Sequence, residues 1–150
     1  MQNNSQAPAA IAHIAGAPDS PLSGLVSFFP QERGVLVTAQ IHGLPHEDGP
    51  CASRVFGFHI HEGDACTPPD FESADGHFDL EGCEHPRHAG DLPPLFGCGG
   101  DAYLSVLTDR FAIPDILGRT VVIHHDPDDF ATQPSGHAGA RIGCGVIRAF

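Results

Sequence analysis

The chain has 150 residues, 41% of them hydrophobic, a length that suits one compact domain and is short for two. Its net charge of −12 comes from 19 acidic residues against seven arginines and no lysine, which excludes the basic stripe that nucleic-acid binding needs. No apolar run reaches the roughly 18 residues of a membrane-spanning helix, so we expect no membrane partner.

Short runs of β-branched, aromatic and aliphatic residues predict an all-β fold, since 18 glycines and 14 prolines leave little room for helices. Residues 1–8 are polar and predicted to form a flexible end, followed by a single domain over residues 9–150. The predicted strands are Ala9–Ala15, Ser23–Phe29, Val35–Ile41, Val55–His61, Tyr103–Thr108, Thr120–His124 and Ile142–Ile147. Seven or eight strands that begin as an antiparallel meander indicate a Greek-key β-sandwich, or flattened eight-stranded antiparallel barrel.

Two long segments interrupt this strand pattern. Residues Glu62–Gly100 are rich in Gly, Pro, Asp, His and Cys, and a second irregular segment covers Asp126–Ala140. Loops of such length are uncommon in compact domains, and they are usually functional or held by something other than core packing. We therefore expect a metal or a disulfide to hold the first one.

Histidine is concentrated around the first of these loops, where five of the 11 histidines fall between His59 and His88. On a strand, period-two alternation turns His59 and His61 to one face and Ile60 to the other. Two buried histidines on one face would each need a polar partner, and shared metal ligation supplies it most simply. A solvated, histidine-rich loop is the alternative interpretation.

The loop itself adds three imidazoles and a carboxylate within fifteen residues, at His77, His85, His88 and Asp91. This donor set suits zinc or copper, and four ligands make a closed tetrahedral site, although a chance polar loop would also contain them. His124 ends the predicted strand TVVIH, where it could reach the other histidines.

Four motifs together resemble the copper/zinc superoxide dismutase family. They are GFHIHE (Gly57–Glu62), the run from His77 to Asp91, TVVIH followed by Asp128 and Asp129, and GHAGARIGCGVI (Gly136–Ile147). The similarity extends from Ala9 to Ile147 and points to a bacterial-like member with shortened zinc and electrostatic loops. It implies a β-sandwich enzyme with copper and zinc cofactors, which disproportionates superoxide to dioxygen and hydrogen peroxide.

The resemblance also implies roles for individual residues. Copper would be held by His59, His61, His77 and His124, and zinc by His77, His85, His88 and Asp91, with His77 bridging the two metals and carrying a proton during turnover. Asp128 would hydrogen-bond one ligand of each metal, His59 and His85, and fix their orientation. Arg141 would dock the superoxide anion, because a guanidinium stays charged at every working pH.

Cysteine positions raise a separate question. The resemblance implies a disulfide between Cys66 and Cys144, and we hypothesise a second bridge between Cys83 and Cys98, with two free thiols as the alternative. Cys51 is left as a free thiol or an alternative partner. Disulfides favour an oxidising, extracytoplasmic compartment, whereas the sequence given shows no export signal.

Other functions on the same fold stay open. A copper carrier, store or chaperone-like module would use the same ligands without turnover, and a β-sandwich interaction domain with a structural zinc would leave several histidines unexplained. Because the segment from Asp128 to Arg141 is short and lacks lysine, we expect a slower or less salt-sensitive enzyme. The family contains monomers and homodimers, and the sequence does not distinguish between these two oligomeric states.

Overall fold

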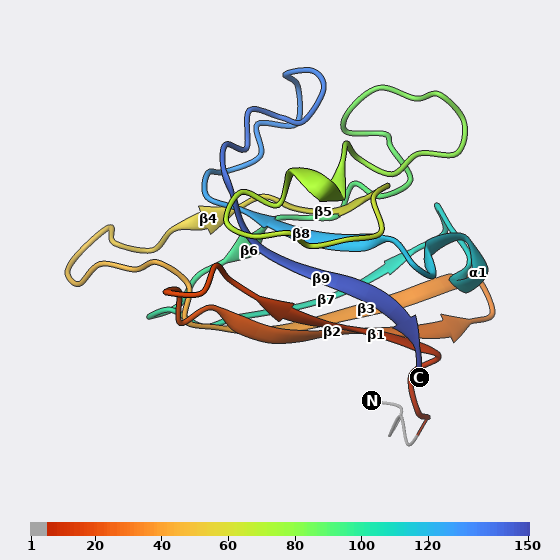
Figure 1. The fold of residues 1–150 in the computed structure, drawn as a ribbon, viewed down its shortest axis with the longest axis horizontal. Helices are drawn as coiled ribbons and strands as arrows, with labels where there is room; N and C mark the ends of the chain where they lie inside the picture. The colour runs from red at the N-terminus through yellow and green to blue at the C-terminus, as the bar shows by residue number, and fades with distance from the viewer. Residues whose placement is uncertain (1–5) are drawn as a thin grey trace.

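The computed structural model describes residues 6–150, which form an all-β fold built on one curled antiparallel sheet (Figure 1). The strands are β1 Ala10–Ala15, β2 Ser23–Gln31, β3 Gly34–His42, β4 Val55–Phe56, β5 Phe58–His61, β6 Leu95–Phe96, β7 Ala102–Thr108, β8 Thr120–His124 and β9 Arg141–Ala149. The helices are a 3-10 turn η1 Glu72–Ala74 and a short α1 Ile113–Ile116.

The order of strands in the main sheet is β5-β8-β9-β1-β2-β3-β7, and β4 pairs with β6 in a small second sheet. β1, β2 and β3 pair in sequence as an antiparallel meander, while β9 returns along the chain to pair with β1. The order 9-1-2-3 is that of a Greek key. The predicted fold class is thereby confirmed.

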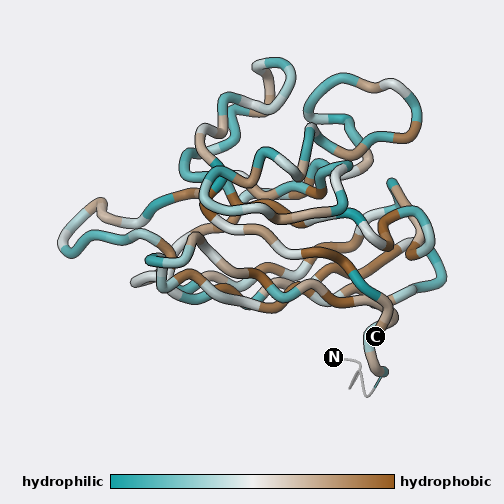
Figure 2. Tube along the Cα trace, in the orientation of Figure 1, coloured by the Kyte–Doolittle hydropathy of each residue, from teal (hydrophilic) through white to brown (hydrophobic). Residues whose placement is uncertain are grey.

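Alternation along the strands builds the core. In β3, Val35, Val37, Ala39 and Ile41 are at most 2% exposed, and the residues between them are more exposed. Successive side chains of a strand point to opposite faces, so the four apolar ones share the inner face. Figure 2 shows hydrophobic residues along the strands and hydrophilic ones in the loops at the top of the view.

Unlike β3, β5 and β8 are buried at every position. Phe58 and Ile60 belong to the main core, whereas His59 and His61 alternate with them and face the opposite side of the sheet. The two long loops cover that side in Figure 1. The predicted separation of the two histidines from Ile60 is therefore confirmed, and the histidines lie between sheet and loops.

Residues 6–150 contain nine strands where seven or eight were expected, because the expected fourth strand is interrupted and the long loop contributes the short strand β6. At Gly57 the chain leaves β4, paired with β6, and enters β5, paired with β8. A Cβ atom at Gly57 would lie 2.8 Å from the Cβ of Ala138 and 3.3 Å from that of His124. The close approach of the loop to residue 57 therefore leaves no room for a side chain where the two sheets part.

One disulfide links Cys66 to Cys144, with an S–S distance of 2.04 Å, as the sequence predicted. Beside it Phe71, Ala74 and Val122 form a second small core. This covalent link and the apolar contacts hold the first part of the long loop against β8 and β9.

The hypothesised second bridge between Cys83 and Cys98 is wrong, because both thiols, like that of Cys51, are free and exposed. The N–H of Cys83 donates to the carboxylate of Asp79 in the long loop between η1 and β6. Cys98 instead forms a tight turn with Asp101 between β6 and β7. Sequence spacing around the candidate ligands gave no information about this separation.

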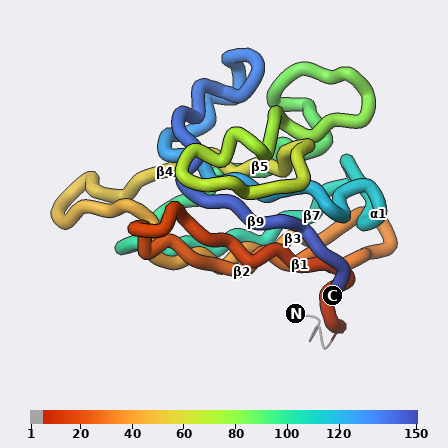
Figure 3. Tube along the Cα trace, in the orientation of Figure 1, coloured from red at the N-terminus to blue at the C-terminus, as the bar shows by residue number. Residues whose placement is uncertain are grey.

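The two ends of the described chain run together, since Ala12 pairs with Ile147 and the two strands lie side by side in Figure 3. The flexible end expected for residues 1–8 falls largely on residues 1–5, which lie outside the described residues. Within residues 6–150, no helix has the length and apolar character needed to cross a membrane.

Candidate metal centre

Backbone pairing between β5 and the long loop brings the candidate ligands together. Isolated antiparallel bridges join His59 to Asp91 and His61 to His77. The N–H of Phe78 donates to the carbonyl of Ile60, and the N–H of Ile60 donates to the carbonyl of Gly90. These contacts place Asp91, 32 positions further along the chain, beside His59 on β5. His124 lies on β8, the strand paired with β5.

The candidate ligands fall into two adjoining groups. In each group, one ligand atom per residue lies within 4.8 Å of the others; the groups are His59, His61, His77 and His124, and His59, His77, His85 and Asp91. His59 and His77 belong to both, with ring centroids 4.1 Å apart. His88 lies at the edge of the second group, with Nδ1 3.1 Å from Oδ2 of Asp91.

Four buried ring nitrogens in this cluster have no hydrogen-bond partner: His59 Nδ1, His77 Nε2, His85 Nδ1 and His88 Nδ1. Buried polar atoms are nearly always satisfied, so four orphans in one place require an explanation. His85 Nδ1 lies 3.0 Å from Asp91 Oδ2 without hydrogen-bond geometry, which places a nitrogen lone pair beside a carboxylate. A cation between them would satisfy both groups.

Asp128 occupies the position between two of these imidazoles. His59 Nε2 donates to Oδ2 at 2.7 Å, and His85 Nε2 donates to Oδ1 at 2.8 Å. Although burial acts to raise the pKa of Asp128, these two hydrogen bonds and the Phe130 N–H lower it well below the usual range. The ionised carboxylate therefore fixes the protons on Nε2, which leaves both Nδ1 atoms free as ligands.

Backbone carbonyls do the same for the other two histidines. The Nδ1–H of His61 donates to the carbonyl of Asp75 at 2.8 Å, and that of His124 to the carbonyl of Gly139 at 3.2 Å. Their Nε2 atoms face each other at 3.2 Å. Burial lowers the pKa of His59 to about 4 and that of His124 to about 3, and it lowers the pKa of His61 well below its ordinary value. Neutral imidazoles are the form that binds metal.

Asp91 contacts three histidines. Burial acts to raise the pKa of this carboxyl, but the hydrogen bond from His77 Nδ1 at 2.7 Å and the nearby His85 and His88 lower it overall. The side chain of Asp91 is 3% exposed, and the buried carboxylate is contacted by three imidazoles and by the backbone N–H of His88, which donates to Oδ2 at 2.9 Å. That arrangement needs a positive charge nearby.

A cleft of about 390 Å³ opens onto the cluster, lined by His61, His77, His88, His124 and Arg141 among others. The guanidinium of Arg141 donates to the carbonyls of Phe71 at 2.9 Å and Asp75 at 2.5 Å. Burial lowers the pKa of Arg141, and the nearby Asp75, Glu72 and Asp70 act in the opposite direction. The structure thus places the predicted arginine at the mouth of the histidine cluster.

The sequence did not reveal two residues that contact the turn of Glu84–Asp91 from other loops. Arg110 and Gln133 hydrogen-bond to its backbone rather than to its ligand side chains. No pattern of residue types signals such contacts, because any backbone segment presents the same groups. His125, in contrast, turns away from the cluster and contacts Arg54 and Asp126.

A curled antiparallel Greek-key sheet that buries two adjoining groups of histidines and carboxylates defines a metal-binding protein of the β-barrel class. The family model described as copper/zinc superoxide dismutase (SODC) matches residues 22–147, and the chain belongs to this family.

Several relatives support this membership. Superoxide dismutase [Cu-Zn] 2 of Aquifex aeolicus is 37% identical over 83% of this chain and 78% of its own length. Superoxide dismutase-like protein YojM of Bacillus subtilis is 40% identical over 61% of this chain and 54% of its own. The crystal structure of a double mutant of a SOD-like protein from Bacillus subtilis superposes with a TM-score of 0.79 at 29% identity, covering 93% of this chain and 97% of that one.

Proposed function

We propose that this protein is a superoxide dismutase that converts superoxide to dioxygen and hydrogen peroxide at a copper site joined to a zinc site. Copper is assigned to His59, His61, His77 and His124, and zinc to His77, His85, His88 and Asp91. His77 is the shared ligand. Imidazoles suit copper, and three imidazoles with one carboxylate make a closed tetrahedral zinc site.

The observation that carries this proposal is the set of four orphaned ring nitrogens. Two of them, on His59 and His77, belong to the copper group, and two, on His85 and His88, belong to the zinc group. His77 also presents Nδ1 to Asp91 on the zinc side, so its ring has one nitrogen for each metal. Seven side chains therefore supply eight ligand positions, as two four-coordinate sites with one shared ligand require.

The side chains at the candidate site have different roles in this reaction. Copper, when bound, would supply the one-electron redox couple that superoxide disproportionation requires, and His77 and Asp91 would be among the residues that hold zinc. Arg141 attracts the anion to the cleft and orients it with its fixed planar donors. His77, the ligand assigned to both metals, would carry one of the two protons that the peroxide product needs. Asp128 keeps the ligand rings in the required tautomer.

A copper carrier or store on the same fold is the second candidate. It is favoured by the similarity to a relative named only superoxide dismutase-like, and by the acidic residues near Arg141, which oppose the approach of an anion. Such a protein needs the ligands but has no use for a cation at the mouth of the cleft. Turnover therefore separates the two functions.

The test is superoxide decay by pulse radiolysis, on protein whose copper and zinc contents are measured on the same sample. We expect copper-dependent decay with about one copper and one zinc per chain. His124→Gln should abolish it, and the matched variant His125→Gln should retain it, because only the first of these adjacent histidines faces the cluster. Full copper occupancy without decay above the free-ion background would establish the carrier instead.

A further inference from the structure

The turn from Glu84 to Asp91 carries three of the four assigned zinc ligands, yet it has little structure of its own. Only Pro86 and Arg87 separate His85 from His88. Inside the turn, the N–H of Arg87 donates to the carbonyl of Glu84, that of Asp91 to the carbonyl of His88, and that of His88 to the side chain of Asp91. A short segment with so few internal hydrogen bonds needs outside contacts to keep one conformation.

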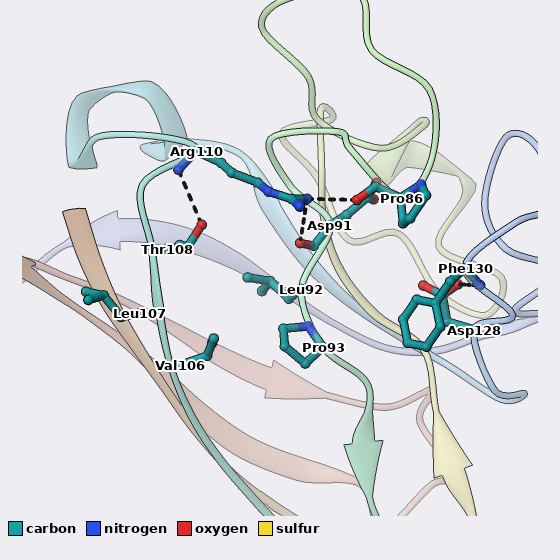
Figure 4. A pocket seen from close by; sticks show the side chains of 10 residues that line it. All are labelled: Pro86, Asp91, Leu92, Pro93, Val106, Leu107, Thr108, Arg110, Asp128 and Phe130. Carbon is teal, nitrogen blue, oxygen red and sulfur yellow. Dashed lines mark hydrogen bonds between the residues drawn. The ribbon is translucent and has the colours of Figure 1, made fainter. Parts of the chain in front are cut away.

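Arg110 provides such contacts from the segment after β7. Its Nη1 lies 2.8 Å from the carbonyl oxygen of Pro86, 3.1 Å from that of His88 and 3.5 Å from that of Asp91. Figure 4 shows the side chain extended over Leu92 toward Pro86 and Asp91. The guanidinium of Arg110 thus contacts carbonyl oxygens near both ends of the turn. Hydrogen bonds from an ionised donor are stronger than those between neutral groups.

Gln133 provides a second contact from the other irregular loop. The N–H of His85 donates to Oε1 at 2.9 Å, and Nε2 of Gln133 donates to the carbonyl of His85 at 2.6 Å. The amide thereby satisfies the N–H and the C=O of one ligand residue, as a neighbouring β-strand would. His85 is the residue whose ring also binds Asp128, so its backbone and its side chain are both fixed.

We propose that Arg110 and Gln133 are positioning residues that hold the turn of Glu84–Asp91 in the ligating conformation before zinc binds. The two side chains come from different loops and contact the turn only through its backbone. Their effect on zinc retention rests on the proposed function, whereas their effect on the conformation of the metal-free turn does not. Separate measurements on the full chain therefore test the two parts.

The first measurement is tryptic cleavage of the metal-free protein, followed by mass spectrometry. With no lysine and seven arginines, the chain offers few cleavage sites, and exposed Arg87 lies within the turn. We expect Arg110→Met and Gln133→Glu to speed cleavage after Arg87 about tenfold and to leave cleavage at the other shared arginines unchanged. Arg110→Lys, which keeps a charged group with three donors, should restore most of the protection.

Arg148→Met and Gln31→Glu are matched controls, since exposed Arg148 and partly exposed Gln31 lie on β9 and β2, away from the turn. Equal cleavage after Arg87 in the variants and the controls would overturn the proposal. Faster cleavage at all arginines in both Arg110→Met and Gln133→Glu would also overturn it, because the residues would then support the fold as a whole.

The second measurement is zinc release to a chromophoric chelator, beginning with the zinc-loaded chain. Replacement of groups that support metal ligands typically costs 10–100-fold in metal affinity, so we expect release at least about tenfold faster in Arg110→Met and Gln133→Glu. Release within twofold of the controls would overturn the role in zinc retention. If the unmodified chain takes up no zinc at all, the proposed function fails, and the cleavage experiment alone then decides on the positioning of the turn.

Discussion

Replacing Asp128 by Asn tests how the ligand rings are oriented. The carboxylate accepts one hydrogen bond from His59 Nε2 and one from His85 Nε2, and its side chain is 1% exposed. An amide of the same shape offers one acceptor and one donor. One of the two imidazoles must therefore meet an N–H group with its own N–H, or move its proton to Nδ1.

Both alternatives have a similar cost. A buried hydrogen bond to a charged group contributes about 1.5–3 kcal/mol, and that contribution is lost if the two N–H groups stay opposed. Moving the proton to Nδ1 instead occupies an orphaned nitrogen that we assign to a metal. Loss of a hydrogen bond to a ligand ring weakens metal affinity by about 10–100-fold, or about 1.4–2.7 kcal/mol. We therefore expect at least one metal to bind at least about tenfold more weakly in Asp128→Asn.

Competition titrations of the metal-free protein with copper(II) and zinc(II) measure this change. Asp129→Asn is the matched control, because it removes the same charge one residue away, from an exposed carboxylate that caps a local turn. Asn preserves the acceptor that this turn needs, so both affinities should stay within about twofold. If Asp128→Asn also kept both affinities within twofold, the tautomer argument would be refuted.

Three further predictions follow from the site and the disulfide. Arg141→Ala should lower the rate constant for superoxide decay about tenfold or more with both metals retained, and loss of metal from this variant would contradict its assignment to the anion. In the metal-free chain, burial lowers the pKa of His59 to about 4 and of His124 to about 3, against about 6.5 when unfolded. Their contribution to the free energy of unfolding is therefore complete above pH 6.5 and falls as the pH drops toward 4, by on the order of 1 kcal/mol per pH unit for each histidine. Urea unfolding at pH 7 and pH 5 measures this, and equal stability would contradict it. Reduction of the Cys66–Cys144 bond, which joins residues 78 apart, should cost about 4.5 kcal/mol in the same assay, and a change below about 1 kcal/mol would show that the loop is held by other contacts.

Strand positions and the faces of the histidines could be predicted because both depend on local patterns. Alternation in β3 and β5 identifies the buried side chains without any knowledge of their partners. The interruption at Gly57 could not be predicted in this way, since the contact that requires glycine comes from Ala138, which is 81 positions away. Tertiary contacts of this kind leave no local signal.

The same distinction applies to the candidate site. Imidazoles and carboxylates are rare enough in a strand or loop that their clustering is informative from sequence. Carbonyl groups are not, so the contacts of Phe71 and Asp75 with Arg141 and of Arg110 with the turn emerged only in the structure. The prediction for Cys83 and Cys98 was wrong because proximity in sequence to the same candidate ligands does not bring the two thiols together.

The disulfide has a consequence for where in a cell the protein can work. It packs with Phe71, and the carbonyl of Phe71 holds the guanidinium of Arg141. The same loop supplies the carbonyl of Asp75, which accepts from both His61 and Arg141, whereas His59, His85 and His124 are held by Asp128 and Gly139. In a reducing environment, we expect the loop to loosen, so that Arg141 and His61 lose carbonyl contacts while the other three histidines stay in place. On the proposed function, the protein would then retain metal at lower catalytic efficiency, so the thiol balance of the compartment would decide whether it acts as an enzyme or mainly as a metal store.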